Sequence, residues 1–145
     1  MVSQPNASRD QEKAAITSAL LTSKLRVPVL PLDQLGRPHL LKLLRAENFK
    51  LGLFSAAPGY GKTSLAAAAA HERDLVAWVT LANNDNQPEQ FWRYVTSALK
   101  TAVPDWRPQV EALLDKPEVD VKRLPFVLAT DLSAVDRSLV LILDN

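Results

Sequence analysis

Short apolar runs alternate along the chain with stretches in which apolar residues recur at helical spacing. The runs at residues 49–56, 75–81 and 138–143 are brief and apolar, and they predict buried strands. Helical spacing and proline positions predict helices over residues 38–47, through the alanine run to about 73, from about 88 to 102, at 109–114 and within 121–135. Apolar strands with helices between them are typical of a parallel sheet covered on both faces. The pattern therefore predicts an α/β fold in three layers, α/β/α.

The expected helices carry further predictions about packing and capping. The first is expected to bury a stripe made of Leu40, Leu41, Leu43 and Leu44. The helix that begins near Pro88 has a candidate N-cap in Asp85 or Asn86. Its aromatic residues are expected to pack in the core rather than contact a ligand; they are Phe91, Trp92 and Tyr94.

Residues 56–63 read A-A-P-G-Y-G-K-T and lie between an expected strand and an alanine-rich helix. They fit a phosphate-binding P-loop in which alanine replaces the usual first glycine. Gly59 and Gly61 permit positive φ and a close approach, so that backbone N–H groups converge on phosphate oxygens at the positive end of the helix. Lys62 would reach the β- and γ-phosphates of ATP or ADP, and the Thr63 hydroxyl would bind Mg²⁺. The candidate nucleotide-binding residues here are Pro58, Gly59, Tyr60, Gly61, Lys62, Thr63 and Ser64.

The last expected strand ends in an acid, Asp144, which would hold the water shell of Mg²⁺ at the mouth of the sheet. Asn145 follows, where hydrolysing relatives of this arrangement often carry a second acid that accepts a proton from water. An amide cannot accept that proton, and general-base assistance is typically worth about 10² to 10⁴ in rate. We therefore expect slow turnover at most, and no catalytic residue is assigned.

Composition excludes several other functions. Seventeen Lys and Arg residues against sixteen Asp and Glu, without a run of like charges, give little support for direct nucleic-acid contact. The longest apolar runs are far shorter than a membrane span, and the polar N-terminus does not resemble a secretory signal, which favours the cytoplasm. The absence of cysteine removes disulfides and thiolate chemistry, and two isolated histidines cannot form a metal site. Any metal should be a hard ion bound by oxygen.

Several segments together resemble a known family. "LLTSKLRVPVLP", "LGRPHLLKLL", "LFSAAPGYGKTSLAAAAA", "VAWVTLANNDNQPEQFWRYVTSALK" and "LVLILDN" are similar to the ATPase domain of the large, maltose-activator-like regulators of the LuxR type, within the STAND class of P-loop NTPases. The resemblance implies a transcription switch that is ADP-bound and monomeric at rest and self-associates with ATP. By position, Lys62 and Thr63 match the Walker A pair and Asp144 the Walker B acid. Arg37, in "LGRPHL", matches a segment near the adenine, and the alternative is that it is a surface charge at the start of a helix.

The resemblance also suggests how the chain is divided. Residues 1–20 would be a flexible or helical appendage, 21–48 an extended adenine-side segment plus helix, and 49–145 a partial P-loop domain. Relatives continue past the Walker B strand, where this chain ends, and in that class a later strand separates the P-loop strand from the Walker B strand. The expected fold is therefore an incomplete P-loop NTPase, a fragment that is poorly soluble or partly molten alone.

Two other functions compete with the switch. A small P-loop kinase would need an acceptor site and lid arginines after the Walker B strand, where this chain has no residues. A decayed relative that no longer binds nucleotide could instead act as an interaction module. Affinity for ATP and ADP, with and without Mg²⁺, separates these possibilities.

Overall fold

The computed structural model describes residues 22–31, 36–45, 50–82 and 85–145, so the expected appendage at 1–20 lies outside the described residues. The elements follow in the order α2 (Pro38–Leu44), α3 (Lys62–Ala70), β1 (Leu75–Thr80), α4 (Pro88–Ala102), α5 (Gln109–Leu114), α6 (Leu124–Leu132) and β2 (Leu139–Asp144). Each of these helices and strands is of the type that the sequence predicted for its residues. The exception among the predictions is the strand expected before α3, which does not form.

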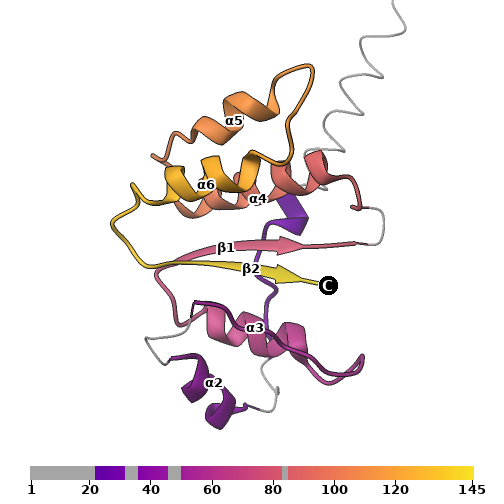
Figure 1. Cartoon of the computed structure of the whole chain (residues 1–145). Coiled ribbons are helices and arrows are strands. Elements are labelled where there is room, and N and C mark those ends of the chain that lie inside the picture. Colours follow the sequence, from indigo (N-terminus) through magenta and orange to yellow (C-terminus); the bar gives the residue numbers. More distant parts are fainter. Residues whose placement is uncertain (1–21, 32–35, 46–49, 83–84) are drawn as a thin grey trace, which may run out of the picture.

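The two described strands form a parallel ladder in which Leu75 lies opposite Leu139 and Thr80 opposite Asp144. Figure 1 shows helices α4, α5 and α6 above this sheet and helices α3 and α2 below it. The α/β class and the parallel sheet are therefore confirmed. Because the strands are parallel, both carboxyl ends reach the same edge of the molecule, which also holds the N-terminus of α3.

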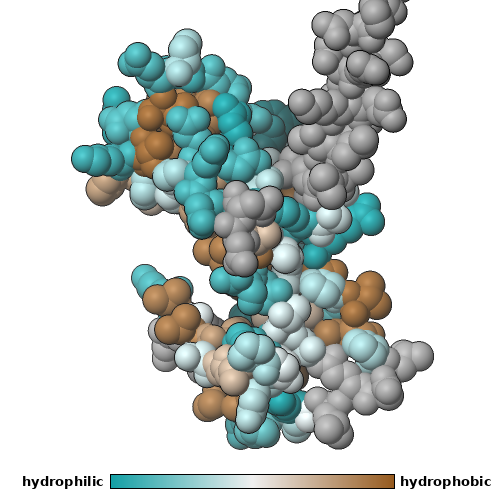
Figure 2. Space-filling model, turned by 90° about the vertical axis from the view of Figure 1, so that its right-hand side faces the viewer, coloured by the Kyte–Doolittle hydropathy of each residue, from teal (hydrophilic) through white to brown (hydrophobic). Residues whose placement is uncertain are grey.

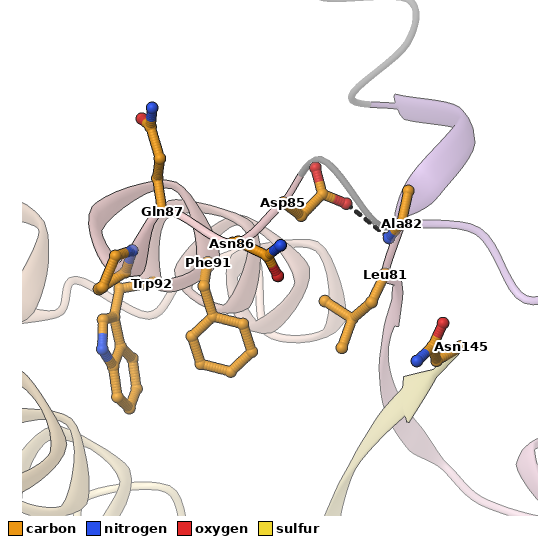
Figure 3. A pocket seen from close by; sticks show the side chains of 9 residues that line it. Leu81, Ala82, Asp85, Asn86, Gln87, Phe91, Trp92 and Asn145 are labelled. Atoms are coloured by element: carbon orange, nitrogen blue, oxygen red, sulfur yellow. Dashed lines mark hydrogen bonds between the residues drawn. The ribbon is translucent and has the colours of Figure 1, made fainter.

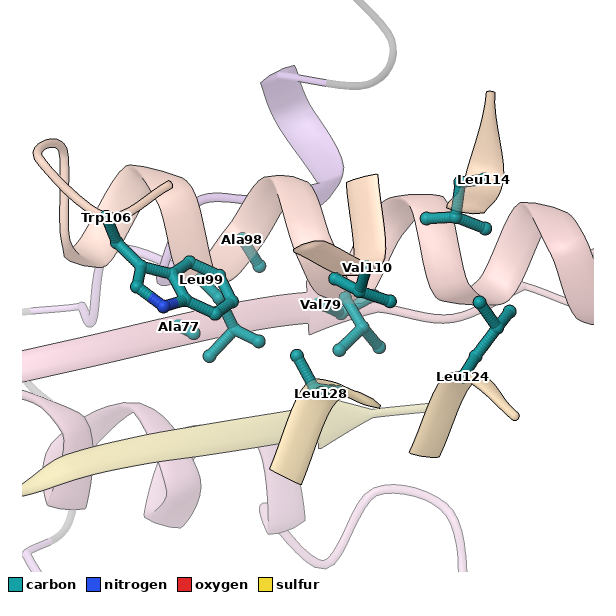
Figure 4. Close-up of a cluster of buried hydrophobic side chains, with 10 residues drawn as sticks. Ala77, Val79, Ala98, Leu99, Trp106, Val110, Leu114, Leu124 and Leu128 are labelled. Carbon is teal, nitrogen blue, oxygen red and sulfur yellow. The ribbon is translucent and has the colours of Figure 1, made fainter. Parts of the chain in front are cut away.

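The larger core lies between the sheet and the upper helices (Figure 4). Its fully buried side chains include Val79 from β1, Leu99 from α4, Val110 and Leu114 from α5, and Leu124 from α6. As expected, the three aromatic residues of α4 pack against this core. From β1, Ala77 and Val79 are fully buried in this core, and burial of apolar surface against them stabilises the helical layer over the sheet.

A pair of hydrogen bonds ties α5 to α6 in this layer. Asp131 is buried, and its carboxylate accepts the backbone N–H of Val110 at 2.9 Å. The indole N–H of Trp106 donates to the Asp131 carbonyl at 3.1 Å. The bond from Val110 satisfies a backbone N–H in the first turn of α5, a group that helix geometry leaves without an intrahelical partner.

A smaller core lies on the other face of the sheet. Ala66, Ala67 and Ala70 of α3 pack against Trp78 of β1. Alanine is the strongest helix former and projects only a methyl group, so α3 lies close to the strands. The alanine run thus sets how near the start of α3 approaches the sheet.

Residues 24–30, which we call the strap, connect the two layers. Leu25 packs against the larger core, while Val27 and Leu30 pack against the smaller one. The strap runs behind β1 in Figure 1, without regular structure after residue 26. Residues 27–31 have neither helix nor strand, whereas residues 22–24 are helical.

The strand predicted at 49–56 is wrong for the described residues 50–56. They form no strand, and Leu51 and Leu53 are 86% and 88% exposed. The segment leads into α3, but the ladder formed by the described residues contains only β1 and β2. A strand requires a neighbour that accepts and donates backbone hydrogen bonds, and among the described residues this segment lacks one.

The buried leucine stripe predicted for the first helix is also wrong. Helix α2 ends at Leu44 and buries none of its residues, and Leu43 is 68% exposed. Its packing within the described chain is mainly with the neighbouring α3. Just beyond the helix, Arg45 forms a two-pronged ion pair with Glu72 at 2.8 and 2.5 Å.

The third expected strand forms, but only part of it is buried. Leu141 and Leu143 of β2 are 38% and 46% exposed.

Figure 2, which views the edge where the strands end, shows brown apolar patches in both the upper and lower halves of the surface. None of the helices in the described part of the chain is both long and apolar enough to span a bilayer.

Candidate functional site

Two glycines shape the loop that precedes α3. Gly59 has φ of +83° and Gly61 has φ of +72°, and no non-glycine residue in the described chain has a positive φ. Gly61 is the N-cap of α3, whose first turn contains no acidic residue. The first-turn backbone N–H groups and the positive end of the helix dipole lie at this end of α3.

A cavity of about 410 Å³ lies beside this loop. Its lining includes most of the predicted nucleotide-binding residues, namely Pro58, Gly59, Gly61, Lys62, Thr63 and Ser64, together with Asn145. Tyr60 is outside this lining and is 63% exposed. Arg37 lies against the loop, because a Cβ on Gly61 would be 3.7 Å from its Nη2 atom.

The Lys62 side chain turns back onto its own loop. Its ammonium donates to the carbonyl oxygens of Ala56 and Ala57 at 2.8 and 3.2 Å. A lysine ammonium has three donors on a flexible stem, so it can exchange these carbonyls for phosphate oxygens at small cost. The same contacts hold the loop closed around the start of α3.

Thr63 and Asp144, which are far apart in sequence, meet at the mouth of the sheet. The Thr63 hydroxyl donates to a carboxylate oxygen of Asp144 at 2.8 Å. Thr63 lies in the first turn of α3, and Asp144 is the last residue of β2. The structure therefore brings together the two residues that sequence analysis selected as metal ligands.

The donor chemistry of this pair fits Mg²⁺. A hydroxyl and a carboxylate are hard oxygen donors, and Mg²⁺ in nucleotide sites commonly takes one or two protein oxygens, with waters and phosphates as its other ligands. The described residues contain no group of three or more His, Cys, Asp or Glu side chains placed to hold a metal. Thr63 and Asp144 would thus hold the ion together with a bound phosphate chain.

A second cavity, of about 340 Å³, lies beyond the carboxyl end of β1 (Figure 3). Its walls combine the apolar residues Leu81, Pro88, Phe91 and Trp92 with the polar residues Asp85, Asn86, Gln87 and Asn145, and Ala82 completes the lining. Asn145 lines both cavities. Asn145, which stands where hydrolysing relatives often carry a second acid, is therefore a lining residue common to both cavities.

Asp85 or Asn86 was expected to cap α4, but neither does, and Asp85 has a different role in the structure. The N-cap of α4 is Gln87, and no side chain caps this helix. The Asp85 carboxylate instead accepts Lys24 Nζ at 2.5 Å and the Ala82 N–H at 2.8 Å. Lys24 also lies 4.9 Å from the centroid of the Tyr94 ring, a cation–π contact. Sequence analysis missed this ion pair because 61 positions separate its partners.

The ion pair fixes the strap to the loop after β1. The Asp85 side chain is 6% exposed and that of Lys24 is 22% exposed. Burial raises the pKa of Asp85, but the hydrogen bonds from Lys24 and Ala82 and the Lys24 charge outweigh burial and lower it below its ordinary value of 3.8. The charged form of Asp85 is therefore the one that stabilises the fold.

Asp85→Asn should lower the free energy of unfolding at pH 7 by about 1.5 to 3 kcal/mol, the range for a hydrogen bond to a charged group. Because the folded-state pKa is depressed, the wild-type advantage should be complete above pH 3.8 and disappear as the pH falls below it. Urea unfolding followed by tryptophan fluorescence at several pH values measures this difference. The matched control is Asp115→Asn, because Asp115 pairs with Arg93 but is 68% exposed, and an equal loss in both variants would contradict the prediction.

Comparison with known proteins relates the chain to bacterial transcriptional regulators. It is 34% identical over 128 residues to the HTH-type transcriptional regulator MalT of Yersinia enterocolitica. It is 35% identical over 128 residues to regulators of that name in Yersinia pestis and Yersinia pseudotuberculosis. Over most of its own length, the chain is similar to one stretch of 128 residues in these regulators. The match covers 87% of the chain but 14% of each relative's length, and no family model matches the chain.

Proposed function

We propose that this chain is the ATP-binding, N-terminal part of a signal-responsive transcriptional regulator, a switch that binds Mg-ATP or Mg-ADP. The observation that carries the proposal is the 2.8 Å hydrogen bond between Thr63 and Asp144. A P-loop threonine and an acid at the end of an apolar parallel strand have no sequence proximity, yet the fold places them in contact. This pairing is what a nucleotide-bound Mg²⁺ requires of a P-loop protein.

In this proposal, the phosphate chain lies over the N-terminus of α3. Backbone N–H groups between Gly59 and Thr63 bind its oxygens, and Lys62 leaves the Ala56 and Ala57 carbonyls to reach the outer phosphates. Mg²⁺, when bound, would neutralise charge on the β- and γ-phosphates. Thr63 and Asp144 would orient this ion, while Pro58 and Ser64 complete the cavity wall.

Hydrolysis would be slow because, among the described residues, the lining of the cavity contains no carboxylate or histidine side chain, and the nearby Asp144 carboxylate is bound to Thr63. Asn145 lines the cavity in the position where a second acid would activate water, and its amide cannot accept a proton. Asp85 lines the neighbouring cavity, but its carboxylate is already bound to Lys24 and the Ala82 N–H. The protein would thus hold ATP as a signal, with self-association in the ATP-bound state and DNA contact made outside this segment.

The second cavity does not favour the kinase alternative. A phosphoryl acceptor could enter about 340 Å³ next to Asn145, but the lining contains no Lys, Arg or His. Kinase-type transfer relies on cations to stabilise charge on the transferred group. We therefore prefer the switch.

Calorimetric titration of the chain with ATP and ADP, with Mg²⁺ or with EDTA, tests the proposal. We expect both nucleotides to bind, Mg²⁺ to tighten binding, and steady-state phosphate release to stay far below ordinary enzyme rates. Absence of binding would favour the decayed interaction module. Phosphate release at ordinary enzyme rates would contradict the switch, and transfer of phosphate to a small molecule would favour the kinase.

A further inference from the structure

The guanidinium of Arg37 lies over the phosphate-binding loop. A Cβ on Gly61 would be 3.7 Å from Arg37 Nη2 and 4.0 Å from its Cζ, so the planar group covers the residue just before Lys62. Arg37 itself is the N-cap of α2 and is exposed. The start of α2 thus brings a second cation to the loop, from a part of the chain that precedes it by more than twenty residues.

The surroundings of this guanidinium are electropositive. The N-terminus of α3 carries the positive end of the helix dipole, and Lys62 belongs to its first turn. The cavity lining beside Gly61 contains no carboxylate. Arg37 lies against Gly61 just outside this lining, and the one carboxylate beside the cavity, Asp144, is bound to Thr63. Two cations and a helix N-terminus close to one space attract a ligand with several negative charges.

We propose that Arg37 binds the phosphate chain of the ligand and not its base, an inference that rests on the proposed nucleotide function. A guanidinium presents a rigid fork of N–H donors that matches two phosphate oxygens, a geometry that a lysine cannot reproduce. Gly61 leaves the space between Arg37 and the loop free of a side chain. Arg37 and Lys62 then hold the phosphate chain between them, and affinity depends on its charge.

Inorganic tripolyphosphate separates phosphate contacts from base contacts, because it has the phosphate chain but no adenine. We expect Arg37→Ala to weaken binding of Mg-ATP and of Mg-tripolyphosphate by the same factor, about 10- to 100-fold. Arg37→Lys should recover part of that loss for both ligands. Lys42→Ala is the matched control, because Lys42 is an exposed cation on the same helix and its loss should change either affinity less than about twofold.

Calorimetry at constant ionic strength gives four distinct outcomes. Equal losses for both ligands support the proposal. A loss for ATP with unchanged tripolyphosphate binding assigns Arg37 to the base and overturns it, and so does no loss for either ligand. Wild-type binding of tripolyphosphate without ATP, lost in Arg37→Ala, would overturn the nucleotide function while supporting the role of Arg37.

Discussion

Replacing Lys62 with alanine is expected to weaken binding of Mg-ATP and Mg-ADP by roughly 30- to 150-fold. This factor corresponds to about 2 to 3 kcal/mol, the upper range for hydrogen bonds to a charged group. Lys62 lies at the N-terminus of α3, where its ammonium now contacts two loop carbonyls and where phosphate oxygens would replace them. The variant keeps Gly59 and Gly61, so the backbone of the loop should persist.

The measurement is isothermal titration of each nucleotide into wild type and variant. Lys116→Ala is the matched control, because it removes the same charge from an exposed position after α5, in the opposite layer. Its affinity should stay within about twofold of wild type. If Lys62→Ala binds ATP as tightly as wild type, the cavity beside the loop does not receive the phosphates and the proposed site is wrong.

Truncating Leu99 to alanine is expected to cost about 2 to 5 kcal/mol of unfolding free energy. Leu99 is fully buried on α4 in the larger core, and removing its branched side chain leaves a void that the surrounding helices fill only partly. Small domains have in total only about 5 to 15 kcal/mol of stability. The variant should therefore unfold at a markedly lower urea concentration than wild type.

Tryptophan fluorescence follows this unfolding, since Trp78 and Trp106 are buried in the two layers. Leu141→Ala provides the comparison, because it makes the same chemical change at a strand position that is 38% exposed. The loss there should be much smaller. Similar losses for the two leucines would mean that the larger core does not carry the stability of the chain.

The shape of the loop before α3 was predictable because its signals are local. The positive φ of Gly59 and Gly61, the helix that starts at Lys62 and the two strands that flank the helical layer all follow from residues adjacent in sequence. Asp144 was selected because an apolar strand that ends in an acid indicates a metal ligand when the same chain also contains a P-loop motif. Thr63 and Asp144 meet because the N-terminus of α3 and the carboxyl end of β2 lie at the same edge of the molecule.

The failures of sequence analysis concern partners that are distant in sequence. Leu51 and Leu53 have the apolar pattern of a buried strand, but pattern alone does not supply a neighbouring strand. The leucines of α2 fit a buried stripe, yet among the described residues α2 packs mainly against α3 and buries none of them. The Asp85 carboxylate has the chemistry of a helix cap and binds Lys24 instead, because the strap passes close to it.

The parallel ladder has a consequence for how fast the chain acquires its native state. Leu75 pairs with Leu139, so the whole segment holding α4, α5 and α6 lies between the partners of every rung. Closing so large a loop costs entropy before any rung is gained, and proteins dominated by such distant pairings fold slowly. The helices of the upper layer, whose contacts are closer in sequence, should therefore assemble on β1 first, with the strand that ends in Asp144 joining last and bringing that carboxylate to Thr63.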